Sequence, residues 1–368
     1  MSDVFALADS LGPRKVVHIH EPSASLRAIV VIDNTACGRA IGGVRMAPDV
    51  GLEECFRLAR AMTMKNAAAG LPHGGGKSVI VGDPKMAAAD KERLVRAFAG
   101  AIRDLVDYVP GPDMGTDERC MAWVKDEINR AAGLPRELGG IPLDEVGATG
   151  YGIMIAATVA EAQGYVTLKG ARLAIQGFGA VGKHTARFLA EKGALLVAAS
   201  DSQGTVIDRE GIDVARLVAW KQEGHSLRDY PGGRKAGPDA VIDAECDIWV
   251  PAARPDVIRK ENVDRLKARL VLQGANIPMT TEAEASLHRR GVMNVPDFIA
   301  NAGGVICAAV EIRGGTAADA FRSIEEKIRA NTAEVLLAAK QGAILPRQAA
   351  VAMAERRVRA AMSCRRWG

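Results

Sequence analysis

The stretch ARLAIQGFGAVGKHTARFLAEKGALLVAASD, residues 171–201, decides the fold of this 368-residue chain. Its apolar run over 171–176 predicts a strand, 183–191 predicts a helix, and 194–199 predicts a second strand. The pattern GxGxxG lies between the first strand and the helix, where a βαβ unit carries its phosphate-binding turn. The stretch therefore predicts a doubly wound parallel sheet of Rossmann type.

The glycine-rich turn is the candidate cofactor site. Its glycines permit a tight turn and a close backbone approach, and a pyrophosphate can then sit on the amides at the helix N-terminus. Asp201 ends the second strand, where a carboxylate accepts from ribose hydroxyls and repels a 2′-phosphate; the nearest following arginine is Arg209. This arrangement favours NAD over NADP. The candidate residues in the turn are Gly177, Phe178, Gly179, Ala180, Val181 and Gly182.

Three later segments continue the predicted sheet: 246–251, 270–276 and 291–295. Ligands of such sheets bind beyond the carboxyl ends of the strands, which makes Ala252 and Asn276 further candidates.

A second stretch, AMTMKNAAAGLPHGGGKSVIVGDP at 61–84, carries two lysines. Lys65 closes a helical pattern, and Lys77 opens a buried strand after the glycine run 74–76. Burial, together with the charge of Lys65, would lower the pKa of Lys77 and make it a base near neutral pH. Asp113, in a turn after another short strand, could relay a proton; a solvated turn lysine and an ordinary turn aspartate are the alternatives. A dinucleotide site combined with these residues suggests hydride transfer to or from a small polar molecule.

Length, composition and charge limit the classes of protein to which this chain can belong. The length predicts two domains. The net charge of +4 is spread among acids, which argues against nucleic-acid binding, and no apolar run approaches a membrane span. Six scattered cysteines and the lack of a signal-peptide pattern at the start fit a cytoplasmic protein. His18 and His20 share a strand face without a third ligand, so we expect an edge strand and no metal site.

We expect an α/β fold in which residues 147–304 form the Rossmann-type NAD domain. Residues 1–146 and 305–368 would form an α/β substrate and oligomerisation domain, with a cleft between the two.

The chain also resembles the glutamate/leucine/phenylalanine/valine dehydrogenase family from about Ile41 to Glu311. The motifs that carry the resemblance, in order, are GGVR, MTMK, LPHGGGK, PDMGT, ATGYG, QGFGAVG, SDSQG, PAA, QGANIP and PDFIANAGGV. The resemblance implies a homo-oligomeric enzyme that reversibly deaminates an L-amino acid to a 2-oxo acid and ammonia with NAD(P).

The resemblance also implies roles for individual residues. Lys65 would hold the α-carboxylate, Lys77 would polarise the oxo group and activate water, and Asp113 would relay the amino proton. Thr149 would contact the nicotinamide carboxamide, and Asn276 would face substrate and nicotinamide.

Two positions of the motifs bear on the substrate. Glutamate enzymes of the family hold the side-chain carboxylate with a lysine before the GG pair and a serine after NAGGV; here these positions are Ile41 and Ala308. Burying a carboxylate without such partners costs several kcal/mol. We therefore expect an apolar substrate of the leucine, valine or phenylalanine type. A glutamate enzyme with another anchor and a non-catalytic NAD-binding protein are the alternatives. The predicted substrate site consists of Lys65, Ile41, Gly42, Gly43, Gly111, Asn276, Val305 and Ala308.

Overall fold

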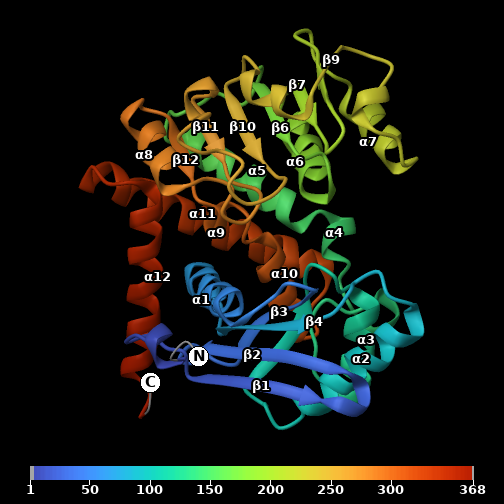
Figure 1. The fold of residues 1–368 in the computed structure, drawn as a ribbon. Helices are drawn as coiled ribbons and strands as arrows, with labels where there is room; N and C mark the ends of the chain where they lie inside the picture. Colours follow the sequence, from blue (N-terminus) through green and yellow to red (C-terminus); the bar gives the residue numbers. More distant parts are fainter. Residues whose placement is uncertain (1–3, 367–368) are drawn as a thin grey trace. The chain divides into compact units, whose positions relative to one another are not determined.

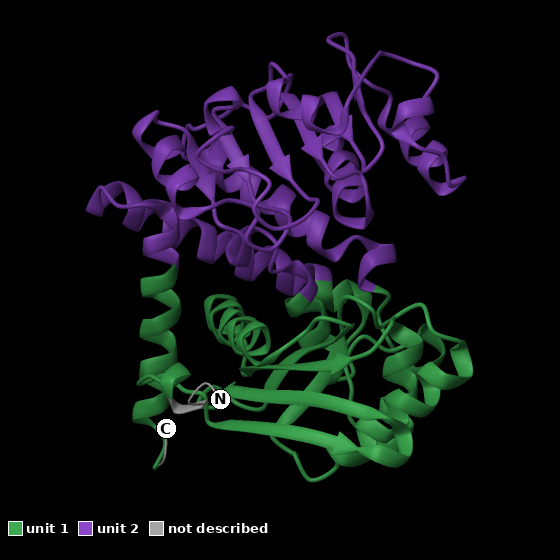
Figure 2. Cartoon of the chain, viewed as in Figure 1, with its two compact units in different colours: residues 1–142, 305–320, 351–368 green, residues 143–304, 321–350 purple. Residues whose placement is uncertain are grey.

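The computed structural model describes residues 4–366 and confirms an α/β fold with two compact units (Figure 1). Unit 1 contains residues up to 142, 305–320 and those from 351 onward, whereas unit 2 contains 143–304 and 321–350 (Figure 2). No helix within the described range is long and apolar enough to cross a membrane.

Unit 2 is built on a seven-stranded sheet with the order β12-β11-β10-β6-β7-β8-β9. Its five parallel strands are β6 (Arg172–Gln176), β7 (Leu195–Ser200), β10 (Ile248–Pro251), β11 (Leu270–Leu272) and β12 (Met293–Val295). The strand order reverses between β6 and β10, which is where such sheets bind their ligands. The predicted Rossmann-type sheet is thus confirmed.

Two short strands extend this sheet beyond the predicted ones. β8 (Thr205–Ile207) pairs antiparallel with β7, and β9 (Arg234–Ala236) pairs antiparallel with β8. Each has only three residues, too few for a periodic signal in the sequence.

The helices whose residues lie wholly or mainly in unit 2 cover the sheet and its loops. They are α4 (Leu143–Val146), α5 (Ala148–Ala162), α6 (Ala180–Glu191), α7 (Val214–Gln222), α8 (Thr281–Arg289), α9 (Asp297–Ala300) and α11 (Ala317–Gly342).

Unit 1 is built on a five-stranded sheet with the order β1-β2-β4-β3-β5. The strands are β1 (Lys15–Glu21), β2 (Leu26–Asn34), β3 (Ala40–Ala47), β4 (Gly74–Val81) and β5 (Tyr108–Pro112). β3 is parallel to β4 and β5, while β1 and β2 run antiparallel to their neighbours. β1, which carries His18 and His20, is an edge strand, as predicted.

Both faces of the unit 1 sheet are covered because its central strands are apolar on both sides. On one face Val30 and Ile80 pack with residues of α2 (Ala88–Ala101) and α3 (Glu118–Ile128). On the other face Val31 and Val79 pack with Cys55 and residues near it in α1 (Leu52–Ala68). The remaining helices that lie mainly in this unit are α10 (Gly303–Ile312) and α12 (Pro346–Ser363).

Short 3₁₀ helices complete the described elements. They span Val4–Leu7, Pro22–Ala24, Arg136–Leu138, Leu227–Asp229, Pro238–Asp243 and Val263–Arg265.

The glycine run 74–76 is strand rather than the loop that the sequence suggests. β4 begins at Gly74, so Lys77 lies in the middle of the strand. A Cβ on Gly75 would lie 2.0 Å from the backbone nitrogen of Thr63 in α1. Gly75 is needed because the helix approaches the sheet too closely for a side chain, not because the chain turns there. A Cβ on Gly74 would instead lie 1.8 Å from the carbonyl oxygen of Asn34, and one on Gly76 would lie 3.0 Å from the ring of Tyr108.

The division into units differs from the predicted domains in two segments, of which the first is residues 143–146, expected in the first domain and found in unit 2. Residues 321–350, expected with 305–368 in the first domain, belong to unit 2. Within that unit, a Cβ on Gly152 of α5 would lie 2.5 Å from the side chain of Ile328 in α11. An apolar helix face predicts burial but does not specify the core that buries it.

Candidate active site

Lys77 and Asp113 form the centre of the candidate site in unit 1. Lys77 is only 5% exposed, and its Nζ lies 2.6 Å from Oδ2 of Asp113. Burial lowers the pKa of Lys77, although Asp113 opposes that shift, and the nearby Arg45 cation lowers it further. The direction agrees with the sequence prediction, but the cation identified here is Arg45, whereas the prediction invoked Lys65.

A glycine in the strand between them lets these two side chains meet. Lys77 is in β4 and Asp113 follows β5, while β3 lies between the two strands. A Cβ on Gly43 of β3 would lie 2.6 Å from Cβ of Asp113 and 3.0 Å from Nζ of Lys77. Any side chain at position 43 would therefore occupy the space of the ion pair.

Arg45 completes the site and was not singled out from the sequence. Its Nε donates to Oδ2 of Asp113 at 3.0 Å, and its Nη1 pairs with Oε1 of Glu54 at 2.5 Å. Burial favours a neutral Asp113, but Lys77 and Arg45 outweigh burial and hold its pKa below the usual value. Arg45 is the last residue of the GGVR motif, and this motif is the sequence feature from which its place in the site could have been predicted.

The turn that carries Lys65 is held against the strand that carries Lys77. Lys65 is half-buried in the last turn of α1, and the neighbouring Asn66 donates from Nδ2 to the carbonyl oxygen of Gly74 at 2.7 Å. Both predicted lysines thus belong to one packed helix–strand pair.

Several residues predicted to line the side-chain pocket belong to one apolar cluster in the structure. Ile41, Val109 and Ala132 form a buried cluster against which Ala308 and Ile312 of α10 pack. Two further candidates border it: a Cβ on Gly111 would meet only Ala132, at 3.8–3.9 Å, and Val305 precedes Ala308 by about one helical turn. The structure thus brings together Ile41 and Ala308, the two positions on which the substrate prediction rests.

Glu311 anchors the loop that follows Ala132 of this cluster. Its carboxylate is buried and accepts from the backbone nitrogens of Gly133, Leu134 and Ile141 at 2.8, 3.1 and 2.9 Å. One side chain of α10 thus satisfies three amides of the loop that follows α3.

We expect Glu311→Ala to lower the free energy of unfolding by about 3 kcal/mol or more, because three amide donors lose their acceptor. Urea denaturation measures the change. Glu326→Ala, which removes an exposed carboxylate of α11, is the control and should change it by less than about 0.5 kcal/mol. Equal effects of the two substitutions would contradict this account.

The candidate cofactor residues gather at the carboxyl end of β6 in unit 2. Gly177 has φ +93°, and a Cβ on it would lie 2.8 Å from the backbone of Ala252, which follows β10. A Cβ on Gly182 would lie 2.1 Å from the carbonyl oxygen of Gly177, so the third glycine lets α6 approach the turn.

The first turn of α6 fits a pyrophosphate. Its N-cap, Gly179, forms no side-chain cap, and a Cβ on Gly179 would meet nothing within 4 Å. The helix therefore presents amides beside open space, as a dinucleotide phosphate requires. Phe178 is buried, with its nitrogen bonded to the carbonyl oxygen of Ser200, whereas Ala180 and Val181 begin the helix.

Both carboxylate oxygens of Asp201 already accept hydrogen bonds from other residues of the protein. Oδ1 accepts from the nitrogens of Gln203 and Gly204 at 2.9 and 3.1 Å, and Oδ2 accepts from Nζ of Lys221 and the nitrogen of Leu227 at 2.8 and 2.9 Å. A carboxylate has about four lone-pair sites. A ribose contact would have to replace one of these bonds, so the sequence argument for NAD keeps only its second part, the repulsion between this carboxylate and a 2′-phosphate.

Two remaining candidates lie near the carboxyl ends of the unit 2 strands or on the helix packed there. Thr149 is in the first turn of α5, and its Oγ1 would lie 3.2 Å from a Cβ on Gly304. Asn276 follows β11 and accepts from Nδ2 of Asn301 at 3.0 Å. Their predicted roles towards nicotinamide and substrate stay predictions.

Comparison with known families gives two matches. The model described as Glutamate/Leucine/Phenylalanine/Valine dehydrogenase matches residues 139–366. The model described as Glu/Leu/Phe/Val dehydrogenase, dimerisation domain, matches residues 13–130.

Individual relatives resemble most of the chain. A glutamate dehydrogenase of Aeropyrum pernix is 39% identical over 91% of this chain and 85% of its own length. An NADP-specific glutamate dehydrogenase of Saccharolobus shibatae is 38% identical over 76% of this chain and 69% of its own length. The Leu-bound hetero-hexameric glutamate dehydrogenase of Thermus thermophilus has a TM-score of 0.85 at 29% identity, covering 96% of this chain and 90% of that one.

Proposed function

Because this chain belongs to the Glu/Leu/Phe/Val dehydrogenase family and is an amino acid dehydrogenase, we propose that its substrate is an apolar L-amino acid. The reaction is the reversible oxidative deamination of leucine, valine or phenylalanine type substrates to the 2-oxo acid and ammonia. The observation that carries the apolar choice is the packing of Ile41 and Ala308 in one hydrophobic cluster.

The chemistry of that cluster argues against a carboxylate side chain. Ile41, Val109 and Ala132 offer neither a positive charge nor a side-chain hydrogen-bond donor. A γ-carboxylate placed there would lose its hydration without a partner, at a cost of several kcal/mol. A leucine side chain would instead gain roughly 1.5–3 kcal/mol on burial.

Glutamate is the second candidate substrate, and the names of the relatives favour it. The proteins from Aeropyrum pernix and Saccharolobus shibatae, 39% and 38% identical to this chain, are both glutamate dehydrogenases. A panel of amino acids, assayed with NAD and NADP for kcat/KM, decides between the two. A higher kcat/KM for leucine, valine or phenylalanine than for glutamate supports the proposal, and the reverse order selects glutamate.

In this proposal, three residues of unit 1 have separate roles in deamination. Lys65 pairs with the α-carboxylate as a point charge. Asp113 takes the proton that leaves the amino group, and Lys77, as a neutral amine, takes a proton from the water that attacks the imino acid. A nicotinamide cofactor held at the glycine-rich turn of residues 177–182 would supply the acceptor for the hydride that leaves Cα.

We expect Arg45→Gln to move the rising limb of the pH profile of deamination to higher pH. The Arg45 cation helps lower the pKa of Lys77, so its removal raises that pKa, and the active neutral amine then forms only at higher pH. The dependence of kcat on pH measures the shift. Arg57→Gln, at an exposed position of α1, is the control and should leave the profile in place. A shift of the Arg45 variant to lower pH would contradict the assignment of Lys77 as the base.

For the cofactor, NAD is the proposed choice, with a small preference over NADP. The Asp201 charge that would repel a 2′-phosphate is paired with Lys221. Lys221→Gln should therefore raise the ratio of kcat/KM for NAD to that for NADP, by about tenfold, because the carboxylate is then uncompensated. Lys192→Gln, at an exposed lysine after α6, is the control. An unchanged ratio would show that Asp201 and Lys221 do not face the cofactor.

We further propose that the chain forms homo-oligomers, supported by the match of residues 13–130 to a dimerisation domain.

A further inference from the structure

An arginine at the start of the last helix pairs with buried polar side chains of unit 2 that have no role in the chemistry described above. Arg347 is the second residue of α12, and its Nη1 lies 2.9 Å from Oδ1 of Asp297. Its Nε donates to both carboxylate oxygens of Glu284 at 2.9 and 2.8 Å, and its Nη2 donates to Oε1 of Gln273 at 2.8 Å. Because a guanidinium is planar and its donors have fixed directions, Arg347 holds these three groups in fixed positions relative to one another.

Asp297 also holds the loop that follows β11. Its second oxygen, Oδ2, accepts from the backbone nitrogen of Ile277 at 2.8 Å. Ile277 has φ +47°, a left-handed conformation that is rare for a β-branched residue and costs free energy. The hydrogen bond to Asp297 therefore stabilises a backbone conformation that isoleucine by itself disfavours.

The same loop is held at its other end by Asn301, the residue after α9. Its Nδ2 donates to the carbonyl oxygen of Gly274 at 3.2 Å and to Oδ1 of Asn276 at 3.0 Å. Asn301 is buried, and its backbone nitrogen donates to the carbonyl oxygen of Asp297 at 2.7 Å. Asp297 and Asn301, about one helical turn apart, thus hold residues 274–277 from both ends.

Asn276 is the residue of this loop that belongs to the predicted substrate and cofactor sites. Its side-chain oxygen accepts from Asn301, so neighbouring residues set the orientation of its amide group. A polar group that meets a substrate must be held close to its productive position, and a displacement of about 1 Å can lower a rate by about 100-fold. The contacts that fix the loop therefore bear on the rate, although they lie behind Asn276.

We propose that Asp297, held by Arg347, is a positioning residue for Asn276: it fixes residues 274–277 so that the amide of Asn276 faces the bound substrate. Neither Asp297 nor Arg347 touches the reacting atoms. The inference rests on the proposed deamination and on the predicted role of Asn276. All of its contacts lie within unit 2.

A double-mutant cycle on kcat/KM tests the proposal, with the amino acid that has the highest kcat/KM in the substrate panel. We expect Asp297→Ala to lower kcat/KM by about 10- to 100-fold. Arg347 keeps its bonds to Glu284 in this variant, so the substitution leaves no isolated buried charge. Asn276→Ala should also lower kcat/KM, and adding Asp297→Ala to it should cause less than about a twofold further loss.

Losses that multiply in the double variant would overturn the proposal, because a merely structural defect acts whether or not Asn276 is present. Arg347→Lys gives a second cycle with Asn276→Ala. It keeps the charge but loses the planar arrangement of donors, so the same pattern is expected with a smaller loss, of about three- to tenfold. Far-UV circular dichroism shows that each variant is folded.

Asp297→Asn tests the hydrogen bond to the loop, because it keeps an acceptor oxygen for the nitrogen of Ile277. It should retain kcat/KM within about threefold of the unchanged protein. A loss as large as that of the alanine variant would overturn the hydrogen bond to Ile277 as the contact that positions the loop.

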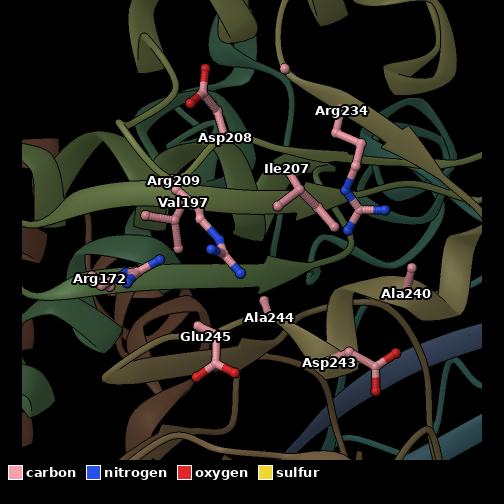
Figure 3. A pocket seen from close by; sticks show the side chains of 11 residues that line it. Arg172, Val197, Ile207, Asp208, Arg209, Arg234, Ala240, Asp243, Ala244 and Glu245 are labelled. Carbon is pink, nitrogen blue, oxygen red and sulfur yellow. The ribbon is translucent and has the colours of Figure 1, made fainter.

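Asp243→Ala is the matched control. Asp243 also pairs with an arginine of unit 2, since its Oδ2 lies 2.7 Å from Nη2 of Arg265. It lines a cavity together with Arg172, the first residue of β6, and so lies at the amino end of that strand (Figure 3). The control should keep kcat/KM within about twofold. A loss of about tenfold or more would overturn the proposal, because any broken ion pair of unit 2 would then have the same effect.

Failure of the proposed function gives a different result from failure of this inference. If the unchanged protein oxidises none of the amino acids, the proposed function is overturned and this inference with it. If the unchanged protein is active and Asp297→Ala keeps its full kcat/KM, only the positioning role is overturned.

Discussion

Replacing Lys77 with alanine is expected to lower kcat by roughly 10³- to 10⁴-fold while leaving cofactor binding unchanged. The buried amine is the proposed base, and a positioned general base contributes up to about 10⁴-fold to a rate. Lys77 is in unit 1, whereas the glycine-rich turn proposed for the cofactor is in unit 2, so the dissociation constant of NADH should not change. Single-turnover kinetics and a fluorescence titration with NADH separate the two quantities.

The matched control for this variant is Lys85→Ala, which removes an exposed lysine shortly after β4. It should retain kcat within about twofold, as surface substitutions away from special features usually have small effects. Asp113 keeps its bond to Arg45 in the Lys77 variant, so the carboxylate does not become an isolated charge. A kcat within tenfold of the unchanged protein would disprove the assigned chemistry.

The double substitution Ile41→Lys and Ala308→Ser is expected to raise the preference for glutamate over leucine by about 10³-fold. It places a cation and a hydroxyl where the cluster now has an isoleucine and an alanine. A paired carboxylate avoids a penalty of about 3–5 kcal/mol, and tenfold in kcat/KM corresponds to about 1.4 kcal/mol. The ratio of kcat/KM for the two substrates measures the change.

Ile41→Met serves as the control for volume, since methionine is apolar and flexible. It should alter both substrates' kcat/KM by less than about tenfold and should not favour glutamate. If the double variant does not gain activity on glutamate, these two positions do not line the side-chain pocket. If the unchanged protein already prefers glutamate, the carboxylate is held by another part of the chain.

The parts of the fold that were predictable have strong local signals. β6, the glycine turn and β7 lie within one residue of their predicted positions, because an apolar run, a GxGxxG pattern and a second apolar run follow each other directly. The role of the glycines 74–76 was not predictable in the same way. A glycine required by a close helix and a glycine required by a turn look identical in a sequence.

The candidate site was predictable in its parts but not in its pairings. Lys77 and Asp113 each lie in a motif of the family. Their contact, however, depends on the order of the strands in the sheet, and a short stretch of sequence does not specify that order. Arg45 was overlooked because the GGVR motif, although recognised, does not show that its arginine reaches Asp113 across the sheet. The pairing of Asp201 with Lys221 joins residues twenty positions apart through tertiary structure alone, and it alters the argument about the cofactor.

Gly43 has a consequence for engineering this protein. β3 separates β4 from β5, and neighbouring strands are about 4.8 Å apart, so Lys77 and Asp113 can join only across a residue that has no side chain. A combinatorial library aimed at new substrates can vary Ile41, Gly111 and Ala308 along the pocket wall. Position 43 must be excluded from such a library, because even alanine there would separate the pair and yield inactive clones whatever the other positions encode.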